Sequence, residues 1–355
     1  MATSFKTLED KDSVVTRNLL HEAIPITGSI VSGTYTGNIK NYSHGMFQSV
    51  YDYPFLSSSA NHIFDLTCGY SAQSGLSGAA SNMNAKKINI YNEMAQVLVG
   101  YDETGAIREF DENGDFSNAG SKIREAYFFN FARLLTKDEI KKGSFSLTLG
   151  VNKDFGNTSN TKTITISDVS GTNEYKVNSP AGEYGILYAT GSDSVVNFKG
   201  YAKVGLVYYQ AGIAVLSASV FNDDSPGGIL NQSATLATGL SGSSTTLLTG
   251  SSISGACDAI RHRLTNTSFN NTVELNSTIY FCRANNTDFN YSSNPTYLSS
   301  SKIVVKNNPD DLPVSYISSV GLYSPDNELL AVAKLSEPLK KDPATEFFLR
   351  VRLDY

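Results

Sequence analysis

The stretch Glu346–Tyr355, EFFLRVRLDY, indicates what kind of fold the chain adopts. Apolar side chains fall at every second position, and mostly charged ones fill the positions between them: Phe347, Leu349, Val351 and Leu353 alternate with Phe348, Arg350, Arg352 and Asp354. Successive side chains of a β-strand point to opposite faces, so this pattern predicts a strand with one apolar face. We expect the strand to be paired into a sheet. Its arginine row is either a solvated face or a contact with an acidic neighbour.

A β-hairpin is predicted directly upstream of this strand. Ile317, Val320 and Leu322 lie on one run, the residues Ser324-Pro325-Asp326-Asn327 have turn chemistry, and Leu329–Leu335 returns. Alternation further upstream predicts strands around 145–151, 183–190, 201–209 and 212–221, with a hairpin turn at 210–212. The last two are apolar on both faces, which is typical of central strands.

Helical signals are few. Residues 85–99 carry apolar side chains at helical spacing, with Asn84 as a cap and Gly100 at the exit. Ser254 could cap a short helix over 256–264, and Ser13 could cap one before Pro25, although that segment is extended in the alternative interpretation. The aromatic run at 126–135 favours a strand. The sequence therefore predicts a mainly β (α+β) fold of antiparallel sheets or a sandwich, with two or three short helices and long Ser/Gly/Asn-rich loops.

Four regions follow from these patterns. Residues 1–60 form an N-terminal arm and irregular segment, and residues 61–221 form a β-rich domain with one helix near 85–99. Residues 222–255 are a flexible low-complexity loop, because a Ser/Gly/Thr-rich stretch of that length is unusual inside a compact domain. Residues 256–355 are a C-terminal β region that completes the same domain or a second one.

Composition and charge narrow the possible partners. The net charge is −6 and no long block of Lys or Arg occurs, which argues against nucleic acid as the main partner. The longest apolar stretch, 212–221, is too short for a membrane helix, and the first residues lack the apolar region of a signal peptide. The three cysteines, Cys68, Cys257 and Cys282, are expected to be free buried thiols. We expect a soluble protein made in a cytoplasm, with no nucleic-acid or membrane partner.

No constellation of residues indicates catalysis. The sequence contains no HExxH, nucleophile elbow, Walker loop or GxGxxG motif after a strand, so we expect no enzyme, no cofactor and no metal site. Asp111, Asn113 and Asp115 imitate the start of a calcium loop, but Phe116 and Lys122 stand where its Gly and Glu belong. We interpret this segment as a hairpin loop.

Two weaker chemical signals stay open. The acidic pairs Asp223-Asp224 and Asp310-Asp311 stand beside prolines and are expected to be turn residues. Cys257 paired with a distant histidine would make a nucleophile, but no local signature supports that pairing.

Several segments resemble a known family. Residues 317–335, ISSVGLYSPDNELLAVAKL, resemble a segment of tail and baseplate proteins of tailed phages, in which I-x-x-V/I-G-L-Y precedes a turn and a second apolar strand. Residues 275–303, LNSTIYFCRANNTDFNYSSNPTYLSSSKI, and the ending EFFLRVRLDY resemble virion structural proteins of contractile-tailed (myovirus-type) phages of marine cyanobacteria and related hosts. GLVYYQAGIAVL and YDYPFLSSSANHIFDL fit the same resemblance.

The resemblance implies a structural subunit of a virion, located in the tail, baseplate or fibre-attachment region. Such a subunit assembles with other virion proteins and with copies of itself. It implies no catalysis or cofactor and assigns no individual residue. The chain would be made in the host cytoplasm and end in the virion. We expect residues 1–60 and 222–255 to contact partners, so that protease cuts them first in the free chain and not in the particle. The alternatives are a receptor- or carbohydrate-binding adhesin, a capsid-associated decoration protein and, from a different class, a hydrolase of the virion or host envelope.

Overall fold

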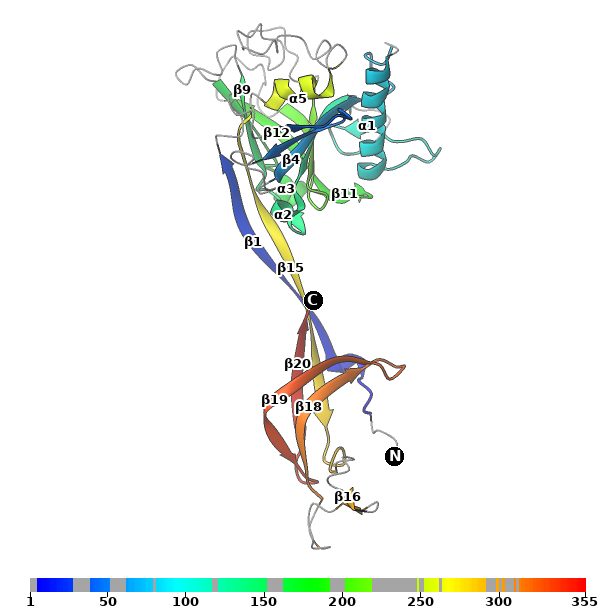
Figure 1. Cartoon of the computed structure of the whole chain (residues 1–355), viewed down its shortest axis with the longest axis vertical. Helices are drawn as coiled ribbons and strands as arrows, with labels where there is room; N and C mark the ends of the chain where they lie inside the picture. Colours follow the sequence, from blue (N-terminus) through cyan, green and yellow to red (C-terminus); the bar gives the residue numbers. More distant parts are fainter. Residues whose placement is uncertain are drawn as a thin grey trace. The chain divides into compact units, whose positions relative to one another are not determined.

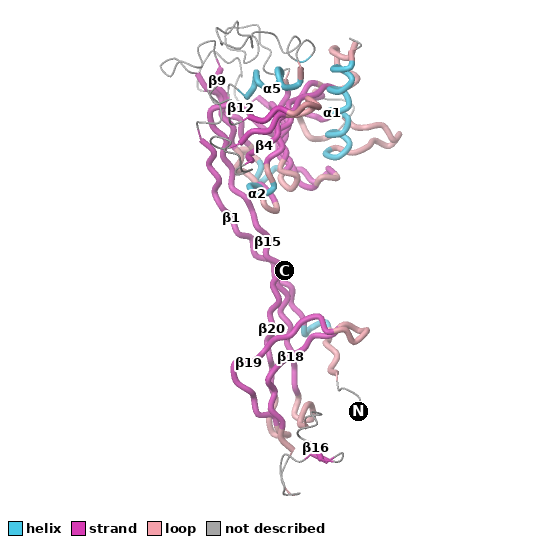
Figure 2. Tube along the Cα trace, viewed as in Figure 1, coloured by secondary structure: helices cyan, strands magenta, loops and turns pink. Residues whose placement is uncertain are grey.

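The protein is mostly β-sheet, as the alternating patterns predict. The computed structural model describes residues 5–27, 39–51, 62–78, 81–116, 121–151, 162–191, 202–218, 248, 252–261, 264–291, 298–299, 302–303, 310 and 313–355. Strands predominate along this part of the chain (Figure 1, Figure 2).

Contacts within the chain divide it into two compact units. Unit 1 consists of Met1–Leu19 and Glu274–Tyr355, and unit 2 consists of Leu20–Val273. The predicted ranges 1–60 and 256–355 therefore each contribute to both units. The predicted loop at 222–255 lies outside the described residues except for Leu248 and 252–255.

Unit 2 is built on an antiparallel sheet in which neighbouring strands are mostly close in sequence. Across the sheet the strands follow the order β9 (Ser146–Val151), β10 (Lys162–Ser167), β12 (Gly182–Gly191), β13 (Ala202–Tyr208), β14 (Ile213–Ser217), β7 (Glu125–Phe131), β4 (His62–Tyr70), β3 (Gln48–Tyr51) and β2 (Ile39–Asn41). The two runs predicted to be central, β13 and β14, are interior strands. The predicted turn joins them, and its Gly212 has φ +68°, a conformation that glycine adopts at little cost.

Smaller strands complete the element list. β11 (Lys176–Ser179) pairs with β12, β5 (Phe110–Asp111) pairs with β6 (Lys122–Ile123), and β16 (Leu298–Ser299) pairs with β17 (Lys302–Ile303). β8 (Glu139–Ile140) pairs with β15 (Leu264–Ala284), whose first residues also pair with β9. β1 (Ser13–Thr27) lies beside β15 in the sheet order. A strand therefore occupies the segment after Ser13, and the extended interpretation is confirmed over the helical one. Only η1 (Asp10–Asp12), a short 3-10 turn, precedes it.

The helices among the described residues are α1 (Asn82–Leu98), α2 (Arg133–Thr136), α3 (Gly171–Glu174) and α5 (Ile253–Arg261). The predicted helix at 85–99 is confirmed as α1, but its cap is Ser81, whose Oγ accepts from the Asn84 amide at 3.1 Å. The helix predicted at 256–264 exists as α5, which begins three residues earlier and ends at Arg261, so the predicted cap Ser254 lies within the helix. The strand predicted from aromatics at 126–135 is confirmed only to Phe131 as β7, because residues from Arg133 onward form α2.

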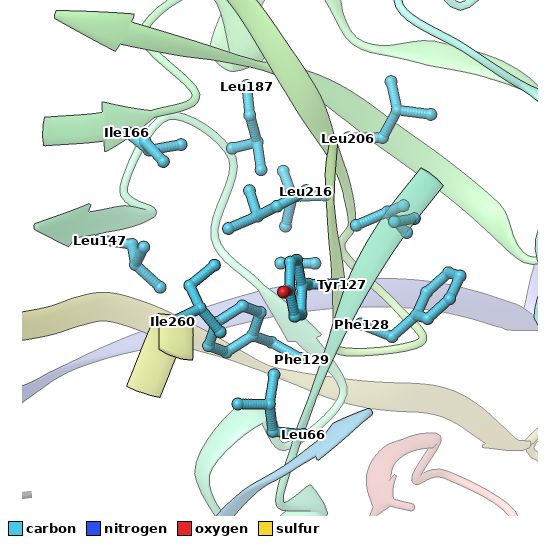
Figure 3. Close-up of a cluster of buried hydrophobic side chains, with 14 of the residues drawn as sticks. Leu66, Tyr127, Phe128, Phe129, Leu147, Ile166, Leu187, Leu206, Leu216 and Ile260 are labelled. Carbon is cyan, nitrogen blue, oxygen red and sulfur yellow. The ribbon is translucent and has the colours of Figure 1, made fainter. Parts of the chain in front are cut away.

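The two longer helices pack on opposite faces of β4. Gly69 faces α1, since a Cβ added there would meet the Lys87 carbonyl oxygen at 2.5 Å. Leu66 lies on the other face with Phe129, its partner across the strand pair, and α5 also contacts β4. Ile260 of α5 points into the same cluster as Leu66 and Phe129 (Figure 3). The core of unit 2 is thus a sheet covered by α5 on one face and α1 on the other.

Unit 1 is a set of long strands without a covering helix among its described residues. β20 (Phe347–Asp354) pairs antiparallel with the second half of β15, from Ser277↔Asp354 to Ala284↔Phe347. β18 (Ser315–Tyr323) and β19 (Leu329–Lys341) form the predicted hairpin, with Val320 opposite Ala333 and Tyr323 opposite Leu329. The strand predicted over 347–353 is therefore confirmed, and its partner is a segment about seventy residues upstream in the sequence.

Candidate functional site

The distribution of buried side chains separates the two units sharply. The hydrophobic core cluster, which includes Phe64, Phe128 and Leu216, lies entirely within unit 2. Among the described residues of unit 1, the buried hydrophobic side chains are Ala284, Val314 and Val351, and none of them joins that cluster. A unit of about a hundred residues ordinarily buries more than half of the surface of its unfolded chain. Unit 1 as a single copy therefore lacks a core of ordinary size.

The hairpin β18–β19 exposes apolar side chains on both of its faces. The row that alternation would bury, with Ile317, Leu322 and Leu335, is only half-buried. Leu330 on the opposite row is 68% exposed and Val332 is 55% exposed. Further exposed apolar or aromatic side chains of the hairpin are Tyr316, Tyr323 and Leu329. An apolar surface on both faces of a two-stranded sheet is typical of a protein–protein contact.

The β20 strand also exposes an apolar side chain, on the face that carries its charged residues. Phe348 stands in the row with Arg350 and Arg352 and is 68% exposed. Arg352 is held within the chain, since its Nε donates to Asp354 Oδ1 at 2.7 Å and a terminal nitrogen donates to Ser277 Oγ at 3.0 Å. Hydrogen bonds from Ser277 and Arg352 lower the pKa of the Asp354 carboxyl. Arg350 and Phe348 thus stand beside an arginine–aspartate pair that is already formed.

The exposed hairpin is held by local turn chemistry. Asn327 has φ +63°, a left-handed conformation that asparagine tolerates better than most residues. Its amide donates to the Ser324 carbonyl at 3.0 Å, and the Ser324 amide donates to the Glu328 carbonyl at 2.8 Å. The Glu328 amide also donates to Ser324 Oγ at 3.1 Å. These hydrogen bonds pair the backbone amides of the turn, so the turn does not depend on packing against a hydrophobic core.

Polar contacts fix the other end of the hairpin. The buried Lys341 ammonium donates to Asn290 Oδ1 at 2.7 Å, to the Asp342 carbonyl at 2.9 Å and to the Asn286 carbonyl at 3.2 Å.

A second polar contact of unit 1 joins β15 to η1, where Arg283 pairs with the buried Asp12. The Glu9 amide donates to the same Asp12 carboxyl and, with Arg283, lowers its pKa. Unit 1 therefore holds its strands with hydrogen bonds and ion pairs where unit 2 uses apolar packing.

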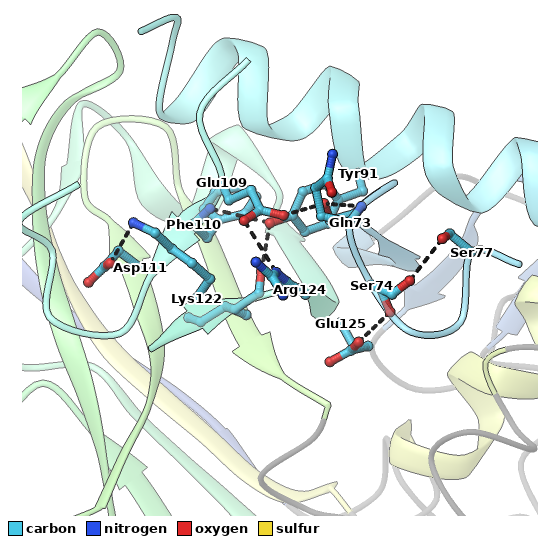
Figure 4. A network of polar contacts seen from close by, with 12 residues as sticks. Gln73, Ser74, Ser77, Tyr91, Glu109, Phe110, Asp111, Lys122, Arg124 and Glu125 are labelled. Carbon is cyan, nitrogen blue, oxygen red and sulfur yellow. Dashed lines mark hydrogen bonds and ion pairs between the residues drawn. The ribbon is translucent and has the colours of Figure 1, made fainter. Parts of the chain in front are cut away.

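The segment that imitates a calcium loop is a hairpin, as predicted. β5 and β6 pair around it, and the buried Asp111 carboxylate is bound by the Lys122 ammonium at 2.8 Å (Figure 4). Asn113 accepts from Lys203. An ammonium group already neutralises the first carboxylate, so the described part of this loop does not present the anionic oxygen cage that calcium requires.

The other sequence candidates do not come together. Asp310 is exposed, and Asp223, Asp224 and Asp311 lie outside the described residues. Cys257 is paired with no described histidine, and its thiol donates to the Leu66 carbonyl oxygen at 3.5 Å. Among the residues that the structure describes, no group of three or more His, Cys, Asp or Glu side chains is arranged to hold a metal ion. No described helix is long and apolar enough to cross a membrane.

Comparison with known proteins adds no further assignment. No protein-family model, curated protein or solved structure matches the chain. The exposed strands of unit 1 are accordingly the feature on which a functional argument rests. Alternation in the sequence located these strands correctly. It could not reveal that their apolar rows are only half-buried, because period-two patterns specify a face and not what covers it.

Proposed function

We propose that this chain is a structural subunit of a tailed-phage virion, in the tail, baseplate or fibre-attachment region, and that it assembles with copies of itself through unit 1. The observation that carries the assembly proposal is the exposed apolar surface of β18, β19 and β20 in a unit without a core of its own. The assignment to a virion is supported by the resemblance to phage structural proteins of residues 275–303, 317–335 and 346–355. All three segments lie in unit 1. In this proposal the chain functions by protein–protein contact and does not catalyse a reaction.

A second copy of the chain is the partner that fits this surface best. Strands that one copy leaves uncovered need a partner when the chain folds, and another copy is the partner always present at the same concentration. Burial of apolar area contributes about 25 cal/mol per Å², so a contact over several side chains the size of Leu330 and Phe348 supplies several kcal/mol. Like surfaces also close into symmetric rings or dimers, as most soluble oligomers do. Other virion proteins would then bind the completed oligomer.

The test of assembly compares an exposed apolar residue in each unit. Phe348→Asp places a charge on the open face of β20, and Leu134→Asp places one on α2 in unit 2, where the side chain is 85% exposed. Analytical ultracentrifugation of the wild-type chain should show an oligomer. Phe348→Asp should weaken its association at least tenfold, and Leu134→Asp should leave it unchanged. A wild-type chain that stays monomeric at tens of micromolar would overturn the assembly proposal.

The virion proposal has its own test. Mass spectrometry of purified particles should find the chain at about six or twelve copies per particle, because tail and baseplate components follow closed symmetry. Hundreds of copies would indicate the capsid decoration protein instead. Absence of the chain from particles would contradict both assignments and leave the assembly result standing.

Glycan binding is the second candidate function, and exposed tyrosines favour it. Tyr291, Tyr316 and Tyr355 of unit 1 present their rings to solvent, and such rings stack on sugar faces. A glycan array probed with the assembled protein separates the candidates. Saturable binding that Tyr316→Ala abolishes, with the oligomer intact, would support an adhesin.

A further inference from the structure

A pair of buried thiols between β4 and α5 is unused by the assembly surface. Cys68 and Cys257 are both fully buried and lie about 190 residues apart in the sequence. Cys68 follows Leu66 by two positions and so lies on the same face of β4, the face that α5 covers. The Cys257 thiol donates to the Leu66 carbonyl oxygen at 3.5 Å, two positions before Cys68 on β4. Burial and the neighbouring Cys68 thiol raise the pKa of Cys257. Both thiols therefore lie in the same part of the buried interface between β4 and α5.

A third polar group reaches the same place. Lys87 of α1 is completely buried, and its ammonium donates to the carbonyl of Leu248. Burial lowers the pKa of this ammonium, and the nearby thiols Cys68 and Cys257 act in the opposite direction. Tyr127 stands opposite Cys68 in the strand pair and is likewise fully buried. A cation beside a thiol stabilises the thiolate, which is the form that reacts with oxidants. Burial acts in the opposite direction and raises the pKa of the Cys257 thiol.

We infer that Cys68 and Cys257 are a redox-convertible pair that closes to a disulfide when a small peroxide reaches it. One thiolate attacks hydrogen peroxide, the O–O bond breaks, and a sulfenic acid and water form. The second thiol then attacks the sulfenic sulfur, forms the S–S bond and releases a second water. Two thiols and one peroxide thus give one disulfide and two waters, so the sulfur atoms are oxidised and the peroxide oxygens are reduced.

The consequence is a covalent tie between the sheet and α5 across a long chain segment. In a reducing compartment the pair stays as thiols, and in an oxidising one the bond persists. Cross-linking residues far apart in sequence removes conformational freedom from the unfolded chain, so the oxidised protein should unfold at a higher temperature. Cys282, which is half-buried in unit 1, serves as an internal reference because it has no such neighbour among the described cysteines.

The experiment treats the full-length protein with hydrogen peroxide and then blocks remaining thiols. Non-reducing peptide mapping of the wild type and of Cys282→Ala should show a Cys68–Cys257 link, with the intact mass lower by two hydrogens per link. The melting temperature should rise by about 5 °C and return when dithiothreitol is added. Cys68→Ala and Cys257→Ala should show neither the link nor the rise.

The variant Lys87→Met tests whether the ammonium group affects the rate of oxidation, a quantity that a purely structural role of Lys87 would not change. Without the ammonium beside the thiols, the rate of disulfide formation should fall about tenfold and depend more steeply on pH, while the final link stays the same. Oxidation of Cys282 in the same wild-type sample shows that peroxide was active. If Cys282 is oxidised while Cys68 and Cys257 remain free thiols in the folded protein, the inference is wrong.

Discussion

At the scale of single residues, Asp168 shows how a buried carboxyl group links the stability of unit 2 to pH. It accepts from the Gly143 amide at 2.7 Å, the Phe145 amide at 2.9 Å and the Tyr209 hydroxyl at 3.1 Å. Burial outweighs these bonds and raises its pKa to about 6. The folded state therefore binds a proton more tightly than the unfolded state, in which the pKa is about 3.9.

The pH dependence follows from that direction. The contribution of Asp168 to stability is complete below about pH 4 and is lost as the pH rises from there through 6, by about 3 kcal/mol. Asp168→Asn does not titrate, so the stability of the wild type relative to this variant should fall between pH 5 and 7. Urea denaturation at both values measures it. A difference that stays constant or grows would show that the three hydrogen bonds dominate and the carboxylate is ionised.

Gly69 is the residue on which the contact between β4 and α1 depends. A Cβ at this position would lie 2.5 Å from the Lys87 carbonyl oxygen and 2.9 Å from the Tyr91 nitrogen, both backbone atoms of the helix. Gly69→Ala should therefore push α1 from the sheet and destabilise the protein by about 2 kcal/mol. Gly75→Ala is the matched control, because nothing lies within 4 Å of its Cβ position and it should change stability by less than about 0.5 kcal/mol. Equal effects in denaturation would contradict this packing.

At the scale of elements, the hairpin β18–β19 depends on its turn because it has little apolar burial of its own. Asn327 at φ +63° is the critical position. Asn327→Gly should preserve the hairpin, whereas Asn327→Val places a branched side chain in a left-handed conformation at a cost of about 1–2 kcal/mol. Hydrogen exchange of the amides in both strands measures the difference, and exchange should be faster only in the valine variant. Unchanged exchange in both variants would mean that contacts between copies, rather than the turn, hold the hairpin.

At the scale of the whole molecule, the two units should differ in how firmly they are folded. Unit 2 contains the hydrophobic core cluster and unit 1 contains none of it. In the dissociated Phe348→Asp chain, amides of β18 and β20 should therefore exchange much faster than those of β7 and β14. Assembly of the wild type should slow exchange in unit 1 and leave unit 2 unchanged. Similar protection of both units in the dissociated chain would show that unit 1 needs no partner.

The fold was predictable where the information is local. Alternation identified β18, β19 and β20, the apolar runs identified β13 and β14 as interior strands, and spacing with a cap residue identified α1. The segment after Ser13 was ambiguous because its helical pattern is weak, and its neighbour β15 is about 250 residues away in sequence. The capping residue Ser81 was missed because Asn84 is also a good cap.

The sequence by itself determined that the chain is built of antiparallel strands, because period-two alternation and turn residues act within a few neighbouring positions. Which distant strands pair, such as β15 with β20, depends on the tertiary fold, as does the contact of Cys257 with β4 at Leu66. The tertiary fold also decided that the apolar row of Glu346–Tyr355 is only half-buried apart from Val351, while Phe348 on the charged row is exposed. Burial is a property of everything packed around a strand, and that packing comes from segments distant in sequence rather than from the strand's own residues.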